Sequence, residues 1–160
     1  MEAVFEKEEF LKALLERLRT EIDAAVAASR DAAAYATDGE ARAESKWDTQ
    51  GLEASYLAAG QAGQAREWAL ALQTLDAQRF LLTGPKERVE VGAVVTVRIG
   101  TGDECFFLVP AGGGQELCAG GREITTLTRQ APLAARLWGK AAGADVLLPN
   151  GSNARILRVE

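Results

Sequence analysis

The sequence contains no histidine, only two cysteines and no apolar run long enough to cross a membrane. The lack of histidine excludes Ser-His and Cys-His catalytic pairs and Cys/His zinc sites. Cys105 and Cys118 lie 13 positions apart, and we predict that they are reduced thiols in the core because the acidic start of the chain shows no secretion signal. We therefore expect a cytoplasmic protein. A net charge of −5 also argues against independent binding to DNA.

Proline and glycine are scarce in the first half of the chain. All four prolines and 12 of the 16 glycines follow residue 82, whereas residues 1–82 contain 20 alanines. Residues 1–82 carry 15 acidic and 9 basic side chains, and residues 83–160 carry 8 and 9. Gly84-Pro85 directly follows a leucine-rich run and is typical of the end of a helix. We therefore predict two domains, residues 1–82 and 83–160.

The first domain is predicted to be an antiparallel helical hairpin. Apolar residues recur at the three- and four-residue spacing of an amphipathic helix over about residues 2–35 and again over about residues 52–80. Two such stripes are most simply buried against each other, as in a coiled coil. Trp68, Leu72 and Leu75 are expected to anchor the base of the hairpin.

The second domain is rich in strand-forming residues. The predicted strands cover residues 89–91, 94–99, 105–109, 123–128, 146–148 and 154–159. A short helix is expected from Ala131 to Lys140, with Pro132 in its first turn. These elements predict a small, mostly antiparallel sheet curled around one short helix, so the fold class of the chain is α+β.

Residues 37–51, between the two helical runs, form the predicted tip of the hairpin. Four carboxylates lie within eleven positions: Asp38, Glu40, Glu44 and Asp48. From the residues alone, a solvated acidic loop is the simpler interpretation of this cluster, and a metal site is the alternative. Lys46 would lower the affinity of the cluster for a cation.

One block of the second domain resembles a known family. Ala131-Pro132-Leu133, followed by Gly139-Lys140 and Gly143, is similar to the Pro-Leu…Gly-Lys…Gly block in the C-terminal domain of the bacterial Gre transcript-cleavage and elongation factors. Val91-Gly92 with Val95, and the Pro149-Asn150-Gly151 turn, fall where that family has matching features. The resemblance covers residues 89–160, whereas the first domain shares only the architecture. It implies an FKBP-like fold for the second domain.

The resemblance implies an accessory factor of bacterial RNA polymerase that is no enzyme of its own. The sheet domain would dock at the secondary channel through the segment around Pro132 and Leu133, with Ala131, Arg129 and Arg136 beside them. The hairpin would enter the channel and bring its tip near the RNA 3′ end. Acidic residues at the tip would help to hold a Mg²⁺ ion in the polymerase, so that water can cut backtracked RNA. No tightly bound cofactor and a monomeric chain are expected.

The tip departs from the family pattern. If Tyr56 marks the tyrosine of the family's cleavage motif, its two key acids fall at Thr49 and Leu52, and Asp48 and Glu53 each miss by one residue. A shift by one residue turns a helical side chain by about 100°.

The departure leaves two interpretations of the tip open. In one, Glu44 and Asp48 hold the metal in a different register, with Asp38, Glu40, Lys46, Trp47 and Glu53 around them. In the other, which the broken motif favours, the hairpin only occupies the channel and alters pausing or initiation. Trp47 would either pack on the hairpin or contact polymerase or nucleic acid.

Two further alternatives belong to other classes of protein. An FKBP-like domain suggests a prolyl isomerase or chaperone-like module, whose pocket is lined by aromatic side chains. The second domain offers only Phe106, Phe107 and Trp138 for such a pocket. The helices could instead pair between two chains and form a structural dimer.

Overall fold

The computed structural model describes the backbone of residues 6–42 and 49–160, and the side chains of these residues except 33, 35–42 and 49–58. The chain forms two compact units, one made of Met1–Glu16 with Ala71–Glu160 and the other of Arg17–Leu70. The first turns of one long helix thus belong to the same unit as the sheet. The division at residue 82 stays a prediction about domains.

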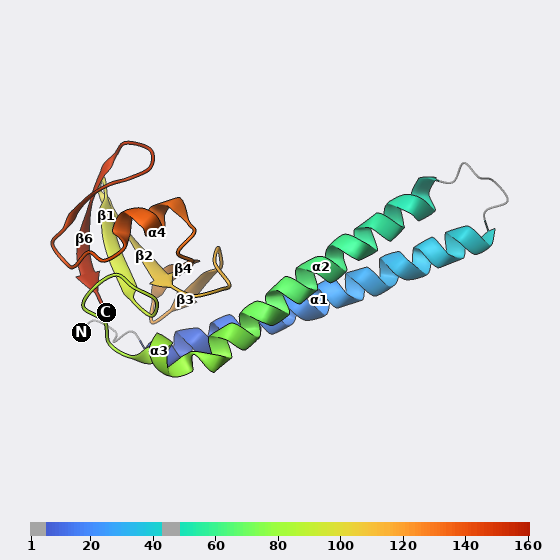
Figure 1. Ribbon diagram of the computed structural model, residues 1–160, viewed down its shortest axis with the longest axis horizontal. Coiled ribbons are helices and arrows are strands. Elements are labelled where there is room, and N and C mark those ends of the chain that lie inside the picture. Colours follow the sequence, from blue (N-terminus) through green and yellow to red (C-terminus); the bar gives the residue numbers. More distant parts are fainter. Residues whose placement is uncertain (1–5, 43–48) are drawn as a thin grey trace. The chain divides into compact units, whose positions relative to one another are not determined.

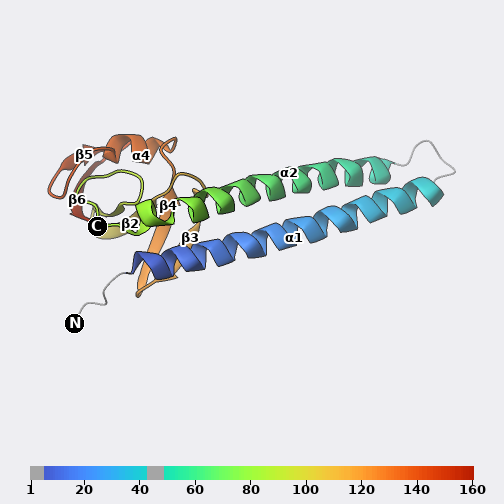
Figure 2. The same ribbon diagram turned by 60° about the horizontal axis from the view of Figure 1, so that its bottom comes forward.

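Two long helices form the hairpin. Helix α1 spans Lys7–Arg42 and helix α2 spans Thr49–Ala77, and the two run side by side (Figures 1 and 2). Both extend further into the predicted tip than the sequence indicated. Gly39 does not end α1, because one glycine costs a helix only about 1 kcal/mol and its neighbours are good helix formers. Neither helix has a stretch apolar enough to span a bilayer within the described residues.

Beyond the fully buried Leu18, small side chains fill the seam of the Arg17–Leu70 unit. Ala25, Ala32 and Ala65 are buried there, whereas Ile22 and Val26 are only half-buried. In the other unit Leu75 is fully buried and Leu72 half-buried, and Trp68 is half-buried within the hairpin unit.

A short helix, α3 (Arg79–Thr83), follows α2. The predicted second helix was therefore too long, since the α2 helix ends at Ala77. Leu82 of α3 is fully buried, whereas Phe80 is 95 % exposed.

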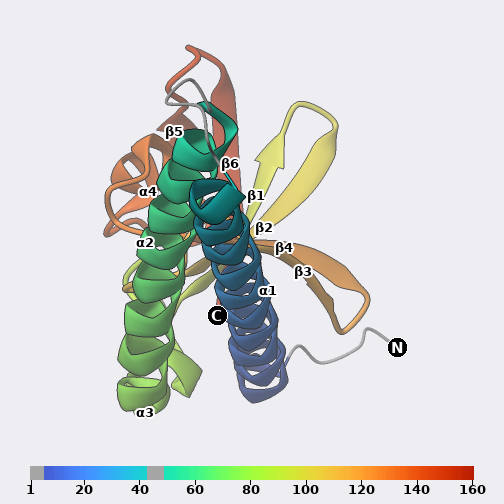
Figure 3. The same cartoon turned by 90° about the vertical axis from the view of Figure 1, so that its right-hand side faces the viewer.

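The sheet has six strands in the order β3-β4-β2-β1-β6-β5. The strands are β1 (Val94–Ile99), β2 (Gly102–Leu108), β3 (Glu116–Ala119), β4 (Arg122–Leu127), β5 (Asp145–Leu147) and β6 (Asn153–Val159). Figure 3 shows the β1–β2 and β3–β4 connections as two separate loops. The α+β class is confirmed, but the sheet is mixed, because β2 and β4 pair in parallel, from Cys105 opposite Ile124 to Leu108 opposite Leu127.

The predicted strand at residues 89–91 is wrong, and β3 was not predicted. Val89 is fully buried, but its backbone exchanges hydrogen bonds with the segment after the fourth helix, from Val89 N to Lys140 O and from Gly139 N to Val89 O, both at 2.8 Å. Gly92, with a φ of 96°, then turns the chain into β1. Strand β3 escaped prediction because its four residues, Glu-Leu-Cys-Ala, are too few to show a clear alternation.

Each face of the sheet carries apolar side chains. One face packs against the fourth helix, α4 (Pro132–Leu137), which Figure 1 shows lying across the strands. The buried residues of this core are Val89, Ala93, Val95, Val97, Phe106, Leu108, Ala134, Leu137, Val146, Leu148, Ala154 and Ile156. On the other face the ring of Phe107 meets that of Phe10 from α1, with 5.2 Å between their centroids.

One charged side chain, Lys7, is buried beside this second face. Its Nζ donates hydrogen bonds to the carbonyl oxygens of Gly84 and Gly92, both at 2.7 Å. Burial, with the charge of Lys86, lowers the pKa of Lys7 to about 8, against an opposing effect of Glu160. The amine thus joins the start of α1 to the two ends of the loop before β1.

A candidate docking surface around helix α4

Helix α4 is held in place by its apolar side. Pro132 begins the helix, where its missing N–H costs nothing. Ala134 and Leu137, three residues apart, are both fully buried in the core of the sheet unit. The backbone N–H of Trp138 donates to the carbonyl oxygen of Ala134 at 2.9 Å and closes the last turn. The predicted helix to Lys140 was therefore three residues too long.

All five residues predicted for docking lie on or next to α4. Pro132 and Arg136 are exposed, and their spacing of four residues places them on the same side of the helix. Ala131 and Leu133 are half-buried, and Arg129 is exposed in the loop that leads to the helix. The structure therefore brings these residues together, as the sequence suggested, although their function is not tested by this placement.

Trp138 is a member of this surface that the sequence analysis missed. Its ring is half-buried against the core, and the guanidinium carbon of Arg129 lies 4.7 Å from the ring centroid. This is a cation–π contact. The sequence carried one signal for it, an aromatic residue directly after a short amphipathic helix. We call the group Arg129, Pro132, Leu133, Arg136 and Trp138 the α4 surface.

The α4 surface is positively charged, although the chain as a whole is acidic. Residues 124–144 contain Arg129, Arg136 and Lys140 but no aspartate or glutamate. Arg88 adds a fourth cation nearby, because its Nη1 donates to the carbonyl of Gly139 at 3.1 Å. Within the described part of the chain, neither Arg129 nor Arg136 has a carboxylate within ion-pair distance.

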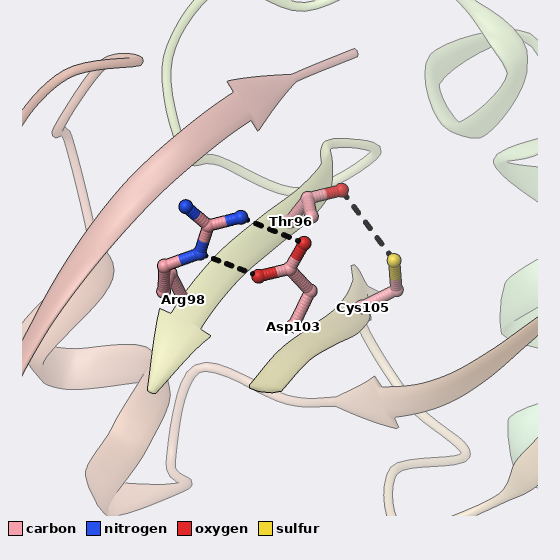
Figure 4. A network of polar contacts seen from close by, with 4 residues as sticks. All are labelled: Thr96, Arg98, Asp103 and Cys105. Carbon is pink, nitrogen blue, oxygen red and sulfur yellow. Dashed lines mark hydrogen bonds and ion pairs between the residues drawn. The ribbon is translucent and has the colours of Figure 1, made fainter. Parts of the chain in front are cut away.

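A second polar cluster lies at the end of β1 and β2 (Figure 4). Arg98 donates to both carboxylate oxygens of Asp103, at 2.9 and 3.4 Å, and these hydrogen bonds raise the pKa of the Arg98 guanidinium. Thr96 Oγ1 lies 3.4 Å from Cys105 Sγ. Arg98 thus contrasts with Arg129 and Arg136, because its charge is already matched within the chain.

The thiols do not sit as predicted. Both cysteines are free, which agrees with the expected reduced state. Cys105 is only half-buried, and Cys118 is exposed. Their assignment to the core was wrong because Cys105 lies on the polar part of β2 and Cys118 lies on β3, at the edge of the sheet.

Phe106 and Phe107, two of the aromatic residues considered for a prolyl-isomerase pocket, do not line a common pocket. Phe106 and Phe107 are adjacent on β2, so their side chains point to opposite faces of the sheet. Phe106 is buried in the core under α4, and Phe107 packs on Phe10.

The predicted metal site lies largely outside the described residues. Glu44, Lys46, Trp47 and Asp48 fall in the undescribed segment 43–48, while Asp38 and Glu40 belong to α1. Glu53 belongs to α2. Among the described residues, no group of three or more cysteine, aspartate or glutamate side chains could hold a metal ion. The assignment of Glu44 and Asp48 to Mg²⁺ therefore stays a prediction.

Comparison with known proteins gives likenesses among solved structures only. No family model and no curated protein sequence matches the chain. The chain is similar to the GreA factor homolog 1 (Gfh1) protein of Thermus thermophilus, with a TM-score of 0.37 and 14 % identity over 91 % of this chain and 94 % of that one.

Two further structures give comparable values. The transcription factor Gfh1 has a TM-score of 0.39 and 18 % identity over 93 % of this chain and 94 % of that one. Thermus aquaticus Gfh1 has a TM-score of 0.37 and 15 % identity over 100 % of this chain and 99 % of that one. Scores this low carry no argument about function, which depends here on the residues of the chain itself.

Proposed function

We propose that this chain is an accessory factor of bacterial RNA polymerase that acts in the cytoplasm and docks through the α4 surface. The observation that carries the proposal is the coincidence of two features at one place. The sequence block that resembles the Gre factors is also the place where Pro132 and Arg136 of α4 and Arg129 of the preceding loop are exposed together. A buried or scattered arrangement of these residues would have removed the basis for docking.

The hairpin supplies the second part of the proposed activity. Helix α1 has 36 residues, which corresponds to a length of about 54 Å at 1.5 Å per residue. A rod of this length can reach into the secondary channel while the sheet domain stays at its rim. We propose that the hairpin occupies the channel and alters pausing or initiation. Stimulated cleavage of backtracked RNA through Glu44 and Asp48 is the alternative.

The docking proposal is tested by binding of the full chain to purified bacterial RNA polymerase. Pro132→Glu places a charge in the middle of the α4 surface, at a position that is exposed and tolerates glutamate in a first helical turn. We expect it to weaken binding about 10-fold or more, because it would place a carboxylate in the contact area and, four residues before Arg136, would compete for that guanidinium. The measurement is a titration of labelled protein with polymerase, followed by fluorescence anisotropy.

A matched variant controls for an effect of charge alone. Pro149→Glu changes an exposed proline of the same unit, in the turn between β5 and β6, and should bind like the wild type. Equal binding by all three proteins would mean that polymerase is contacted elsewhere. No binding by the wild type would reject the proposed partner.

A further inference from the structure

We infer that the α4 surface recognises a carboxylate on an apolar protein segment of its partner, and that Trp138 positions Arg129 for this contact. The inference rests on the proposed function, since the partner in question is RNA polymerase. It adds the chemistry of the partner's segment and one residue, Trp138, that acts through another.

The arginines provide the first step of the argument. Arg129 and Arg136 are exposed and, among the described side chains, have no carboxylate partner. Other exposed arginines of the same unit differ in this respect: Arg98 is paired with Asp103 and Arg155 lies 3.9 Å from Asp145. These two pairs show exposed guanidinium groups that are matched within the chain, whereas both arginines of the α4 surface lack a carboxylate partner among the described side chains. A planar guanidinium with no carboxylate partner among the described side chains is suited to a bidentate bond with a carboxylate.

The stacking of Arg129 provides the second step. An exposed arginine loses much rotamer freedom when it binds, and this loss reduces the net gain of an ion pair. The contact with Trp138, 4.7 Å from the guanidinium carbon to the ring centroid, already restricts the side chain. Trp138 is itself held against the core by its half-buried ring. Arg129 is thus partly ordered before the partner arrives.

The apolar members of the surface decide between protein and nucleic acid as the partner. Pro132 and Leu133 lie beside the arginines and offer contact area to an apolar side chain. The cations of this surface would also attract phosphates, but the net charge of −5 on the whole chain opposes the approach of a polyanion. Trp138 cannot stack freely on a base while Arg129 covers its ring. A carboxylate set among apolar side chains fits this surface better than a phosphate backbone does.

The test compares neutral variants of the arginines in the full chain. We expect Arg129→Gln and Arg136→Gln each to weaken binding to polymerase about 5-fold, as for charge pairs at an interface rim, and to flatten its dependence on salt. Arg98→Gln makes the same change of charge at a guanidinium that is already paired and should leave binding unchanged. If both α4 variants bind like the wild type while Pro132→Glu still loses affinity, the carboxylate inference is wrong and the docking proposal stands.

The role of Trp138 needs a readout that a loss of packing would not produce. Trp138→Leu should weaken binding as much as Arg129→Gln does, and the double variant should be no weaker than either single variant, because both remove one contact. Trp138→Phe keeps an aromatic face for the guanidinium and should restore most of the affinity. Additive losses would show that Trp138 does not act through Arg129.

A cross-linking experiment identifies the partner's group directly. Arg136→Lys introduces an amine that a carbodiimide can join to a carboxylate with loss of water, and native Lys140 offers a second amine nearby. We expect mass spectrometry to find an amide bond from position 136 to an aspartate or glutamate of polymerase. Absence of this bond in a complex that forms normally would contradict the inference. A 5-fold loss of affinity for free RNA in Arg136→Gln, with polymerase binding intact, would identify nucleic acid as the partner instead.

Discussion

At the scale of single residues, Lys7 is the most unusual side chain of the described chain. A buried amine is costly, and here two backbone carbonyls at 2.7 Å compensate for the lost water. A neutral amine still has two N–H groups, so both hydrogen bonds can persist after the proton is lost. The two hydrogen bonds therefore do not require Lys7 to be charged, and burial makes the charged form costly in the folded protein.

The lowered pKa of Lys7 predicts a dependence of stability on pH. The pKa of Lys7 is lowered to about 8 in the folded protein from its ordinary value of 10.5, which we take for the unfolded chain. Between these two pH values the unfolded chain therefore binds more protons than the folded protein. The free energy of unfolding should therefore rise with pH in this window, by up to about 1 kcal/mol per pH unit. Urea unfolding at several pH values, compared with Lys7→Met, isolates this contribution. A constant difference between the two proteins from pH 7 to 10 would contradict it.

Gly92 shows how one residue is fixed by its surroundings. It has a φ of 96°, and a Cβ at this position would lie 2.5 Å from the carbonyl oxygen of Leu81. Residue 92, two positions before β1, must therefore be both left-handed and free of a side chain. Gly100 also has a positive φ, of 64°, but a Cβ there would meet nothing within 4 Å.

The two glycines make a matched pair for measuring stability. Gly92→Ala should lower the free energy of unfolding by about 2–4 kcal/mol, because backbone strain and a clash with a carbonyl add together. Gly100→Ala should lower it by about 1 kcal/mol, since only the strain remains. Thermal unfolding followed by circular dichroism gives both values. A similar loss in the two variants would mean that the loop around residue 92 shifts to accept a methyl group.

At the scale of elements, the sequence predicted those whose pattern is local. Strand β1 matched its predicted bounds because five of the six residues in Val94–Ile99 are β-branched, and α4 was found from Pro132 and the block behind it. The docking residues were placed for the same reason, since they are neighbours in the sequence. Trp138 was missed as a member of the surface because its contact with Arg129 spans a whole helix and depends on tertiary packing.

Elements that depend on distant contacts were predicted less well. The parallel pairing of β2 with β4 joins segments that are separated by β3, and no local pattern specifies it. Residues 89–91 look like a strand, but the carbonyl and amide of Val89 bond to the turn after α4 instead. Helix ends were displaced because glycine and aspartate near the tip are tolerated within α1.

At the scale of the whole molecule, the proposed activity separates attachment from action. The α4 surface belongs to the sheet unit and the acidic tip to the hairpin. Substitutions at the tip should therefore leave docking intact, and substitutions at α4 should leave the tip intact. This separation makes the role of the tip acids testable in a protein that still binds.

The test of the tip is cleavage of RNA in a halted, backtracked elongation complex at limiting Mg²⁺. If the hairpin only occupies the channel, the wild type should not accelerate cleavage, but it should compete with an authentic Gre factor in the same reaction. Faster cleavage that disappears in the double variant Glu44→Ala, Asp48→Ala would establish the alternative. Cleavage that is unchanged in this variant would reject both residues as metal ligands.

The strand order has a consequence for how the protein folds during its synthesis. Strand β6 lies between β1 and β5, so one edge of β1 stays open until residues 153–159 have been synthesised. Phe10 and Lys7 likewise await Phe107 and Gly92, which are synthesised about 100 and 85 positions after them. At roughly 5–20 residues per second the start of α1 would wait for many seconds with Phe10 uncovered. During this interval the chain is most exposed to aggregation and to the chaperones that prevent it.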